Sequence, residues 1–489
     1  MRMTQLIEGV EDQVNIVGTI GDLEVTGLTA DSRAVEPGFL FAALPGALAD
    51  GRDFIPQALD KGASALLLPQ GSPHGTAVPV LESAQPRRLF AQMAARFYGD
   101  QPATIAAVTG TNGKTSVATF LRQIWTRLGK TAASMGTLGV TAPNVKIDGA
   151  LTTPDPVALH KNLKTLHDAG VDHLAMEASS HGLDQFRLDG VKISAAGFTN
   201  LSRDHLDYHG DMAAYLAAKA RLFEDLLPEG ATAVLNADAP EFAALSKLCR
   251  ARKLRVLSYG HSADEIVLNA VTHRPDGQDL SLTVLGKTYK VRLPLIGEFQ
   301  VMNALCALGL ALSEITDQDA AVLALEHLDG APGRMERVAT LSNGATVVVD
   351  YAHTPDALQT VLLALRPHVG GKLSVVFGCG GDRDKGKRAQ MGAVAARHAD
   401  ATIVTDDNPR SEDARQIRKS ILAACPDALE IGDRAAAIAQ GMDTLGPGDI
   451  LLVAGKGHER GQIVGEKVLP FSDADAVRTV QKELESKNR

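Results

Sequence analysis

The run Thr109-Gly110-Thr111-Asn112-Gly113-Lys114-Thr115-Ser116 decides the fold that we expect of this chain. The apolar stretch 105–108 before it is typical of a buried strand, and residues 117–121 after it continue a helical pattern. Glycine lets the backbone wrap an anion without a Cβ clash, and a helix N-terminus offers unpaired N–H groups. The run therefore predicts a phosphate-binding loop, with Lys114 on the terminal phosphates and the Thr115 hydroxyl on Mg²⁺.

This loop departs from the standard pattern G-x-x-x-x-G-K-[ST], which requires a glycine where Val108 stands. A glycine-lysine-threonine run also occurs by chance in loops. The strand on one side and the helix on the other favour the phosphate-binding interpretation.

Length and composition limit the class of protein. At roughly 100–200 residues per domain, 489 residues suggest about three domains, and 45% hydrophobic residues suffice for sizeable cores. The net charge of -9 argues against non-specific nucleic-acid binding, so local cations and metal must meet any polyanionic substrate.

The cysteines and the apolar segments suggest where the protein works. Four cysteines without C-x-x-C spacing argue against a disulfide framework or a zinc site and fit a reducing cytoplasm. The N-terminus has no signal-peptide core, and no apolar run approaches the ~20 residues of a membrane span. We expect a cytoplasmic monomer that acts on small molecules, without a nucleic-acid partner.

Three blocks of sequence follow one another. Residues 1–100 hold strand candidates at 38–44 and 65–68, with a short amphipathic helix between them at 53–61. Residues 101–335 open with the phosphate loop and alternate helical patterns with strands. Strand candidates in this block are 173–177, 195–200 and 232–236. Such alternation predicts βαβ units and an α/β fold with a doubly wound, mostly parallel sheet.

The third block, residues 336–489, predicts a second parallel sheet. Its strand candidates are 345–350, 372–378, 402–406 and 450–454. The turns that follow them are 350–353, 378–387, 407–410 and 455–459, and each carries charged or imidazole side chains. Ligands of such sheets bind outside the carboxyl ends of the strands, which predicts a site along one edge.

Three features of the phosphate-loop block have competing interpretations. Glu177 follows a strand, where a carboxylate commonly holds Mg²⁺, although a solvated loop glutamate is the alternative. The turn 200–210 packs two histidines and two aspartates, which suits metal or phosphate but equally a solvated turn. Lys219 lies within an apolar helical stretch. A half-buried lysine is costly unless it is paired or modified, and a snorkelling surface lysine is the default alternative.

Two arginines in the third block suit recognition of a carboxylate. Arg383 lies in the charged run 380–388 and could grip a carboxylate in bidentate fashion, or the run is a solvated loop. Pro409 restricts the turn 407–410, so Arg410 is held on a stiff support.

Together these runs resemble the Mur ligase family, the ATP-dependent amide-forming enzymes of peptidoglycan synthesis. The resemblance covers essentially the whole chain and rests on 109–116, 177–182, 200–210, Lys219, Asn303, 332–336 and 350–355. Within the family, 31–33, 380–388 and 455–459 are similar to members that add the third residue of the peptide. The form Asp407-Asn408-Pro409-Arg410 is similar to the version associated with meso-diaminopimelate rather than L-lysine.

The resemblance implies three α/β domains and one reaction. A small N-terminal domain (1–100) would bind the UDP-sugar, a central P-loop-type domain (101–335) would bind ATP, and a C-terminal Rossmann-like domain (336–489) would bind the amino acid. ATP would phosphorylate the side-chain carboxylate of UDP-N-acetylmuramoyl-L-alanyl-D-glutamate. The amine of meso-diaminopimelate would then attack the acyl phosphate, giving the UDP-tripeptide, ADP and phosphate.

The same resemblance assigns residues to ligands. ATP would contact Gly110, Thr111, Asn112, Gly113, Lys114, Thr115, Ser116, Asn303, Arg334, Asp350 and His353. The UDP-linked dipeptide would contact Ala30, Ser32, Ala47, Leu48, Ala49, Thr152, Thr153, Ser179, Gln185 and Arg187. Diaminopimelate would contact Arg383, Asp407, Asn408, Pro409, Arg410, Gly455 and Glu459. The catalytic residues would be Lys114, Glu177, His205 and Lys219, with Mg²⁺ held by Thr115, Glu177, His205 and a carbamylated Lys219.

One departure and three rivals accompany this interpretation. The stretch 45–51 lacks the polar side chains of many relatives, which leaves the side-chain contacts of residues 47 and 48 open. A folylpolyglutamate-synthetase-like ligase would share the phosphate loop and Lys219, but the separate N-terminal domain and the turn 407–410 speak against it. A non-catalytic nucleotide-binding regulator would be favoured by loss of the catalytic residues, which are present. Arg410 disfavours a ligase that adds L-lysine.

Overall fold

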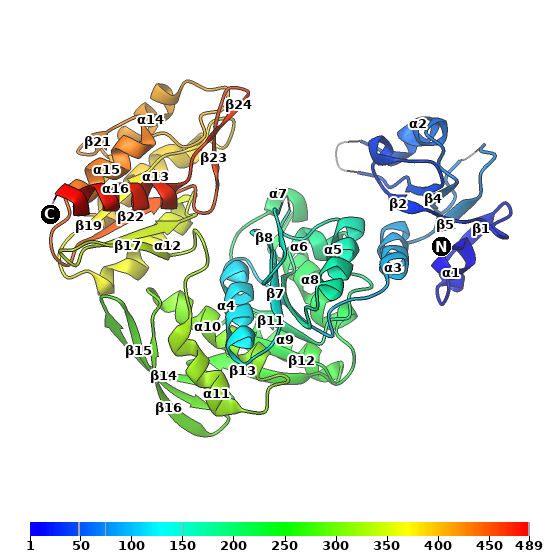
Figure 1. The fold of residues 1–489 in the computed structure, drawn as a ribbon, viewed down its shortest axis with the longest axis horizontal. Coiled ribbons are helices and arrows are strands. Elements are labelled where there is room, and N and C mark those ends of the chain that lie inside the picture. Colours follow the sequence, from blue (N-terminus) through cyan, green and yellow to red (C-terminus); the bar gives the residue numbers. More distant parts are fainter. Residues whose placement is uncertain (47–48, 74, 150, 488–489) are drawn as a thin grey trace. The chain divides into compact units, whose positions relative to one another are not determined.

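The computed structural model describes residues 1–46, 49–73, 75–149 and 151–487 (Figure 1). Ala47 and Leu48, two of the residues expected at the nucleotide sugar, lie outside the described residues. The chain divides into two compact units. One comprises Met1–Lys114 and Trp125–Leu257, and the other Thr115–Ile124 and Ser258–Arg489.

A five-stranded sheet forms the N-terminal part of the first unit. Its elements are α1 (Met3–Leu6), β1 (Asn15–Val17), β2 (Gly27–Thr29), β3 (Phe39–Ala42), α2 (Ile55–Asp60), β4 (Ala65–Pro69), β5 (Val80–Ser83) and α3 (Pro86–Tyr98). In the order β1-β5-β4-β3-β2, neighbouring strands run parallel except β1 and β5. Leu40 of β3 and Leu67 of β4 share a core with Leu89 of α3. The strands expected at 38–44 and 65–68 are β3 and β4.

The phosphate loop belongs to a larger sheet in the first unit. Its strands are β6 (Thr104–Thr109), β7 (Ala132–Gly136), β8 (Gly139–Thr141), β9 (Lys146–Ile147), β10 (His173–Glu177), β11 (Ala195–Phe198) and β12 (Thr232–Asn236). The order is β12-β11-β6-β10-β7-β8-β9, parallel from β12 to β7 and antiparallel beyond it. Because β6 lies between β10 and β11, the turns that follow these three strands meet at one edge.

Helices follow these strands along the chain. They are α4 (Lys114–Arg127), α5 (Pro156–Asp168), α6 (Ser180–Asp184), α7 (Leu206–His209), α8 (Met212–Arg221) and α9 (Phe242–Ala251). Leu159 and Leu163 of α5 pack in one core with Ile105 of β6 and Leu174 of β10. Burial on the sheet explains why β6 and β10 are apolar runs rather than alternating ones.

The second unit contains an antiparallel run that the sequence patterns did not predict. It consists of β14 (Ile266–Arg274), β15 (Gly277–Val284) and β16 (Lys287–Leu293). The end of β13 (Arg255–Gly260) pairs in parallel with β14. Two helices follow, α10 (Glu298–Ala311), which is buried along most of its length, and α11 (Gln318–Leu323).

The C-terminal part of the second unit is a six-stranded sheet with helices on both faces (Figure 1). Its strands are β17 (Glu336–Thr340), β18 (Thr346–Asp350), β19 (Leu373–Phe377), β20 (Ala401–Val404), β21 (Leu429–Glu430) and β22 (Ile450–Ala454). They follow the order β17-β18-β22-β19-β20-β21, and all but β17 run parallel. The four strands expected in this block are β18, β19, β20 and β22, so their turns share one edge as predicted.

Two cores flank this sheet. Its helices are α12 (Pro355–Leu365), α13 (Gly386–His398), α14 (Ala414–Leu422), α15 (Arg434–Asp443) and α16 (Asp473–Lys487). Leu362 of α12 and Ile421 of α14 belong to one core, and Ile438 of α15 and Val477 of α16 to the other. A two-stranded hairpin, β23 (Gly461–Val464) and β24 (Lys467–Pro470), follows β22. Within the described ranges, no helix is long and apolar enough to cross a membrane.

Candidate active site

The phosphate loop is held in shape by the turn that follows β11. Gly110 has φ +146° and Gly113 has φ +90°, values that favour glycine. The N–H of Asn112 donates to Asn200 Oδ1 at 3.0 Å, and Thr199 Oγ1 donates to the Asn112 carbonyl at 2.6 Å. The loop between β6 and α4 is therefore held by groups from the turn that follows β11, so its backbone shape does not depend on its own sequence alone.

Two lysines meet at one carbonyl of this loop. Lys114 Nζ donates to the Gly110 carbonyl at 2.9 Å, and Lys219 Nζ donates to the same oxygen at 2.8 Å. Lys219 is 1% exposed, and its Nζ lies 4.3 Å from the centre of the Tyr215 ring. Burial and the neighbouring Lys114 ammonium lower the pKa of Lys219 to about 6. From the residues alone, a snorkelling surface lysine is the default interpretation, whereas the side chain is fully buried.

Glu177 closes the end of β10 beside the loop. Its carboxylate accepts the Thr137 N–H at 2.8 Å and the Thr137 hydroxyl at 3.2 Å, and the residue is 2% exposed. The Thr153 hydroxyl donates to the Glu177 backbone carbonyl at 3.0 Å. Glu177 is thus a held, buried carboxylate rather than a solvated loop residue.

His205 occupies the turn before α7 with a left-handed backbone, φ +52°. Its side chain is 48% exposed and lies 3.5 Å from the Asp204 carboxylate, measured from Nε2 to Oδ2. The His205 ring is 4.8 Å from the ring of His181 and 6.3 Å from that of Tyr215, between centres. Tyr215 therefore lies near both His205 and Lys219.

No group of three His, Cys, Asp or Glu side chains that could hold a metal occurs in the part of the chain that the structure describes. Mg²⁺ commonly takes one or two carboxylates together with substrate phosphates and water. The donors expected here, the Glu177 carboxylate and the Thr115 hydroxyl, are the hard oxygen ligands that such an ion prefers. Thr115 and Ser116 lie in the first turn of α4, both buried.

The residues expected at the peptide end of the substrate form one hydrogen-bonded group. Arg187 donates to the Thr153 carbonyl at 2.6 Å and to Gln185 Oε1 at 2.7 Å. The Ser179 N–H donates to the Thr153 hydroxyl at 3.0 Å. Thr152 is linked through its hydroxyl to Thr137, which also holds Glu177.

The residues expected at the nucleotide sugar lie in the N-terminal sheet region. Ser32 is buried and its hydroxyl donates to Gln57 Oε1 at 2.7 Å. Ala30 and Ala49 are exposed. Exposed alanines offer backbone groups rather than side-chain hydrogen bonds to a ligand.

In the second unit, the residues expected at the nucleotide line up along one series of contacts. Asn303 donates to Gln300 Oε1 at 2.9 Å, and Gln300 donates to the Arg334 carbonyl at 3.1 Å. The Arg334 guanidinium lies 4.5 Å from the centre of the Tyr351 ring.

Asp350 accepts the Met335 and Ala352 N–H groups at 2.7 and 2.8 Å. Burial raises the pKa of the Asp350 carboxyl, an effect that Arg334 opposes. His353 Nδ1 lies 2.9 Å from the Tyr351 carbonyl.

The turn 407–410 is supported by the hairpin that follows β22. Arg410 has φ +51°, and its N–H donates to the Ile463 carbonyl at 3.0 Å. Its carbonyl accepts the Gly465 N–H at 2.8 Å. The guanidinium donates to the Gly381 carbonyl at 2.8 Å, which brings the turn 407–410 next to the run 380–388. Arg383 in that run is exposed and donates to the Asp382 carbonyl.

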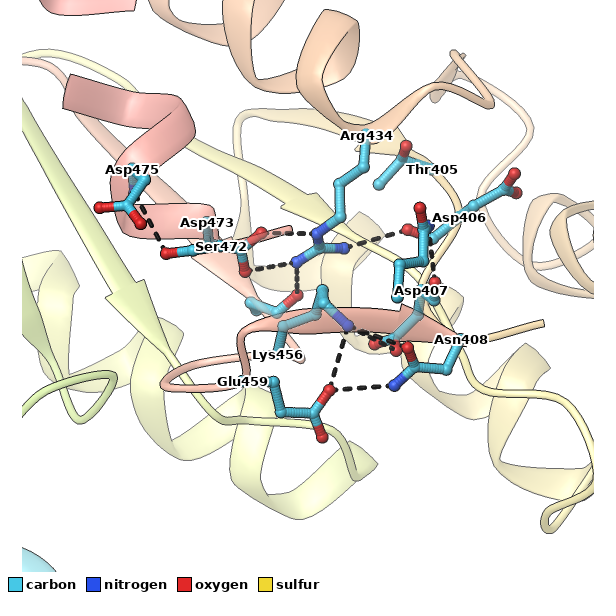
Figure 2. Close-up of polar contacts among 12 residues, drawn as sticks. Thr405, Asp406, Asp407, Asn408, Arg434, Lys456, Glu459, Ser472, Asp473 and Asp475 are labelled. Carbon is cyan, nitrogen blue, oxygen red and sulfur yellow. Dashed lines mark hydrogen bonds and ion pairs between the residues drawn. The ribbon is translucent and has the colours of Figure 1, made fainter. Parts of the chain in front are cut away.

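Behind these turns lies a charged cluster with two cations that the sequence patterns did not single out (Figure 2). Lys456 and Arg434 are both buried. Lys456 contacts side chains of the turns 407–410 and 455–459, and Arg434 contacts the carbonyls of Asp406 and Ala454, which precede these turns. A lysine between two glycines directly after a buried strand was the available signal for Lys456. Arg434, at the start of α15, gave none.

Comparisons with known proteins agree with this arrangement. A model of the Mur ligase family catalytic domain matches residues 24–98, one of the Mur ligase middle domain matches 108–311, and one of the Mur ligase glutamate ligase domain matches 333–457. A protein of Bradyrhizobium diazoefficiens named UDP-N-acetylmuramoyl-L-alanyl-D-glutamate--2,6-diaminopimelate ligase is 55% identical over 94% of this chain and 95% of its own length. A Caulobacter vibrioides protein of the same name is 54% identical over 92% and 94%.

Solved structures are similar as well. A structure of UDP-N-acetylmuramoyl-L-alanyl-D-glutamate--2,6-diaminopimelate ligase has a TM-score of 0.72 at 35% identity, covering 94% of this chain and 95% of that one. MurF from Thermotoga maritima in complex with ADP has a TM-score of 0.60 at 20% identity, covering 96% and 100%, which shows a shared fold. The predicted α/β fold class is confirmed. The enzyme class is that of ATP-dependent ligases. The chain belongs to the Mur ligase family.

Proposed function

We propose that this chain is an enzyme of the MurE type, which uses ATP to join meso-2,6-diaminopimelate to UDP-N-acetylmuramoyl-L-alanyl-D-glutamate in peptidoglycan synthesis. The observation that carries this proposal is the similarity to ligases of that name over nearly the whole chain, at up to 55% identity among the relatives reported above. The turn Asp407-Asn408-Pro409-Arg410, held by the hairpin, supports the choice of amino acid.

The reaction needs two steps, because a carboxylate is a poor electrophile. In the first, an oxygen of the glutamate side chain attacks the γ-phosphorus of ATP and ADP leaves. In the second, an amine of diaminopimelate attacks the acyl carbon, the amide C–N bond forms, and phosphate leaves as the amine loses its proton. The residues of the phosphate loop would neutralise the phosphates as the two anions approach each other.

The residues around Gly110 suit the first step. Gly110 to Ser116 would cradle ATP with Lys114 on its outer phosphates, while the nucleotide would also contact Asn303, Arg334, Asp350 and His353. Mg²⁺, held by Thr115, Glu177, His205 and a Lys219 carbamate, would supply charge neutralisation between the anions. A Glu177 carboxylate held by Thr137 and the burial that lowers the pKa of Lys219 to about 6 support these assignments.

The UDP-linked dipeptide would bind to the first unit. Its nucleotide sugar would contact Ala30, Ser32 and Ala49, together with residues 47 and 48. Its peptide end would meet the hydrogen-bonded group of Thr152, Thr153, Ser179, Gln185 and Arg187. The proposed domain limits remain 1–100 for the UDP-sugar, 101–335 for ATP and 336–489 for the amino acid.

Arg410 would select the amino acid. Diaminopimelate differs from L-lysine by a second carboxylate on its distal carbon, and a guanidinium on a stiff turn can bind that group in bidentate fashion. Arg383, Asp407 to Pro409, Gly455 and Glu459 would contact the rest of the amino acid.

On sequence grounds we propose that the protein acts on small molecules in the cytoplasm and works as a monomer.

Mass spectrometry of the reaction products tests the proposal. Purified protein with ATP, Mg²⁺, UDP-N-acetylmuramoyl-dipeptide and meso-diaminopimelate should yield the UDP-tripeptide, and omission of ATP should abolish it. A matched reaction with a folate and glutamate distinguishes the rival ligase class. Glutamate addition to the folate without tripeptide formation would contradict the proposal.

A further inference from the structure

Two turns expected to bind the amino acid come from strands that are not neighbours. The turn 407–410 follows β20 and the turn 455–459 follows β22, and both strands pair with β19 between them. Side chains on these turns need a bridge if they are to keep a fixed mutual geometry, because no backbone ladder joins β20 to β22. The structure contains such a bridge.

Lys456 provides this bridge between side chains (Figure 2). Its side chain is 0% exposed, and its Nζ donates to Asn408 Oδ1 and to Glu459 Oε2, each at 3.0 Å. Asp407 Oδ1 lies 4.0 Å from the same nitrogen. The ammonium therefore stands between two carboxylates and one amide, all of them from residues expected at the amino acid.

Asn408 and Glu459 also contact each other, which closes the cluster into a triangle. Asn408 Nδ2 donates to Glu459 Oε2 at 3.0 Å, and Asn408 Oδ1 additionally accepts the Ile463 N–H at 3.0 Å. Glu459 Oε2 is thus occupied by Lys456 and Asn408. Figure 2 shows the other carboxylate oxygen turned away from Lys456, on a side chain that is 34% exposed.

A second buried cation joins the backbones of the same two turns. Arg434 donates to the Ala454 carbonyl at 2.9 Å and to the Asp406 carbonyl at 3.3 Å, the residues just before Gly455 and Asp407. Asp473 neutralises it through hydrogen bonds of 2.7 and 2.8 Å. Because Arg434 already ties the backbones, the contacts of Lys456 determine chiefly how the side chains are oriented.

Burying an ammonium is costly, and a pair of apolar side chains would often stabilise a fold as well or better. Stability alone is therefore a weak explanation of Lys456. Its contacts end on the two side chains that, under the proposed function, receive the polar groups of the incoming amino acid. A held carboxylate binds a ligand ammonium with less loss of side-chain entropy than a mobile one.

We infer that Lys456 is a positioning residue for amino-acid binding: it fixes Glu459 and Asn408 in the geometry that receives the incoming amino acid, without touching that substrate itself. This inference rests on the proposed function. It predicts that loss of Lys456 weakens binding of the amino acid and leaves binding of ATP and of the UDP-dipeptide intact.

Steady-state phosphate release tests this inference, with the amino acid varied at saturating ATP and UDP-dipeptide. For Lys456→Met we expect the KM for diaminopimelate to rise about 10- to 100-fold, as is typical when the support of a binding group is lost. The KM values of ATP and UDP-dipeptide should stay near those of the wild type. Lys419→Met, on the exposed face of α14, is the matched control and should leave all three KM values unchanged.

A double-mutant cycle separates positioning from a general structural role. If Lys456 acts through Glu459, the variant Lys456→Met/Glu459→Gln should have no higher KM for the amino acid than Glu459→Gln alone. The double variant removes the carboxylate that Lys456 contacts at 3.0 Å, although Asp407 at 4.0 Å remains, so it should fold more readily than Lys456→Met. If Lys456→Met does not fold, Lys456→Gln replaces it in the cycle.

Three results would overturn the inference. One is an unchanged KM for the amino acid in Lys456→Met, another is an equal rise in the KM of all three substrates, and the third is full additivity in the cycle. A wild-type protein that releases no phosphate with any amino acid would overturn the proposed function and the inference with it. That failure appears before any variant is made, so the two can be told apart.

Discussion

At the scale of single residues, Lys219 shows how burial prepares an amine for reaction. Its ammonium would share the Gly110 carbonyl with that of Lys114 and would have almost no contact with water. The charged form is therefore disfavoured, and the pKa falls to about 6. Only a neutral amine can attack CO₂, forming an N–C bond and losing a proton. Under the proposed assignment the product would be a carbamate, an anion that could bind metal.

We predict that the carbamylated fraction of Lys219 falls as the pH is lowered. A lysine whose pKa is lowered to about 6 is mostly neutral above that pH and becomes protonated as the pH falls through it. Protein equilibrated with ¹³C-bicarbonate should therefore show a carbamate resonance at pH 8 that declines toward pH 5. Lys219→Met is the control and should lack the resonance at every pH. A signal that persists in this variant, or that grows on acidification, would contradict the assignment.

Sequence patterns reached some of these residues and missed others for physical reasons. The apolar neighbours of Lys219 left a surface lysine as the default, because its partner, the Gly110 carbonyl, lies 109 residues away and only the fold brings them together. Lys456 lies in the charged run 455–459, and nothing in that run tells a buried lysine from a solvated one. Its burial follows from the packing of β20, β19 and β22.

At the scale of elements, one ion pair joins two helices to the edge of the C-terminal sheet. Arg434 begins α15 and Asp473 begins α16, and both side chains are 0% exposed. The pair also holds the carbonyls that precede the turns 407–410 and 455–459. Removing one partner of a buried pair leaves an uncompensated charge, which is far more costly than never having built the pair.

We therefore predict a large loss of stability for Asp473→Ala. The free energy of unfolding should fall by about 3–5 kcal/mol, since the Arg434 guanidinium is left buried without a counter-ion. The matched control is Asp475→Ala, two residues along the same helix, where the side chain is 74% exposed and pairs with Arg478. Loss of that surface pair should cost about 1 kcal/mol or less. Urea denaturation that gives equal losses for the two variants would contradict this role of Asp473.

The parallel strands were predicted better than the antiparallel ones. Strands such as β6, β10, β12 and β22 are buried on both faces, and their continuous apolar runs stand out in the sequence. The longer strands β14 to β16 mix buried residues with half-buried and exposed ones, so they lack the continuous apolar run that marks the parallel strands. The helix expected at 53–61 is α2 preceded by a 3₁₀ turn, because Asp50 caps that turn and Pro56 starts the α-helix.

At the scale of the whole molecule, the loop and the turn to which the proposed reaction assigns ATP and the amino acid belong to different units. The loop Gly110 to Lys114 is part of the first unit, and the turn 407–410 is part of the second. The amine of the amino acid must reach the acyl carbon beside the transferred phosphate for an amide to form. We therefore predict a closing movement of the amino-acid-binding domain during the reaction.

Small-angle scattering measures this movement. Addition of a non-hydrolysable ATP analogue together with UDP-dipeptide should decrease the radius of gyration relative to the free protein. The analogue alone, and buffer with Mg²⁺ alone, are the controls for effects of a single ligand. Profiles that remain superimposable after both ligands are added would count against open and closed states.

The most direct test of the central claim is phosphate release from ATP with UDP-N-acetylmuramoyl-dipeptide, comparing meso-diaminopimelate with L-lysine for the wild type and Arg410→Ala. Loss of a charge-assisted bidentate contact of about 1.5–3 kcal/mol should lower kcat/KM for diaminopimelate by at least about tenfold. We predict release by the wild type with diaminopimelate but not with L-lysine, and its loss in the variant. Equal release with L-lysine would contradict the role of Arg410, and no release with either amino acid would contradict the ligase itself.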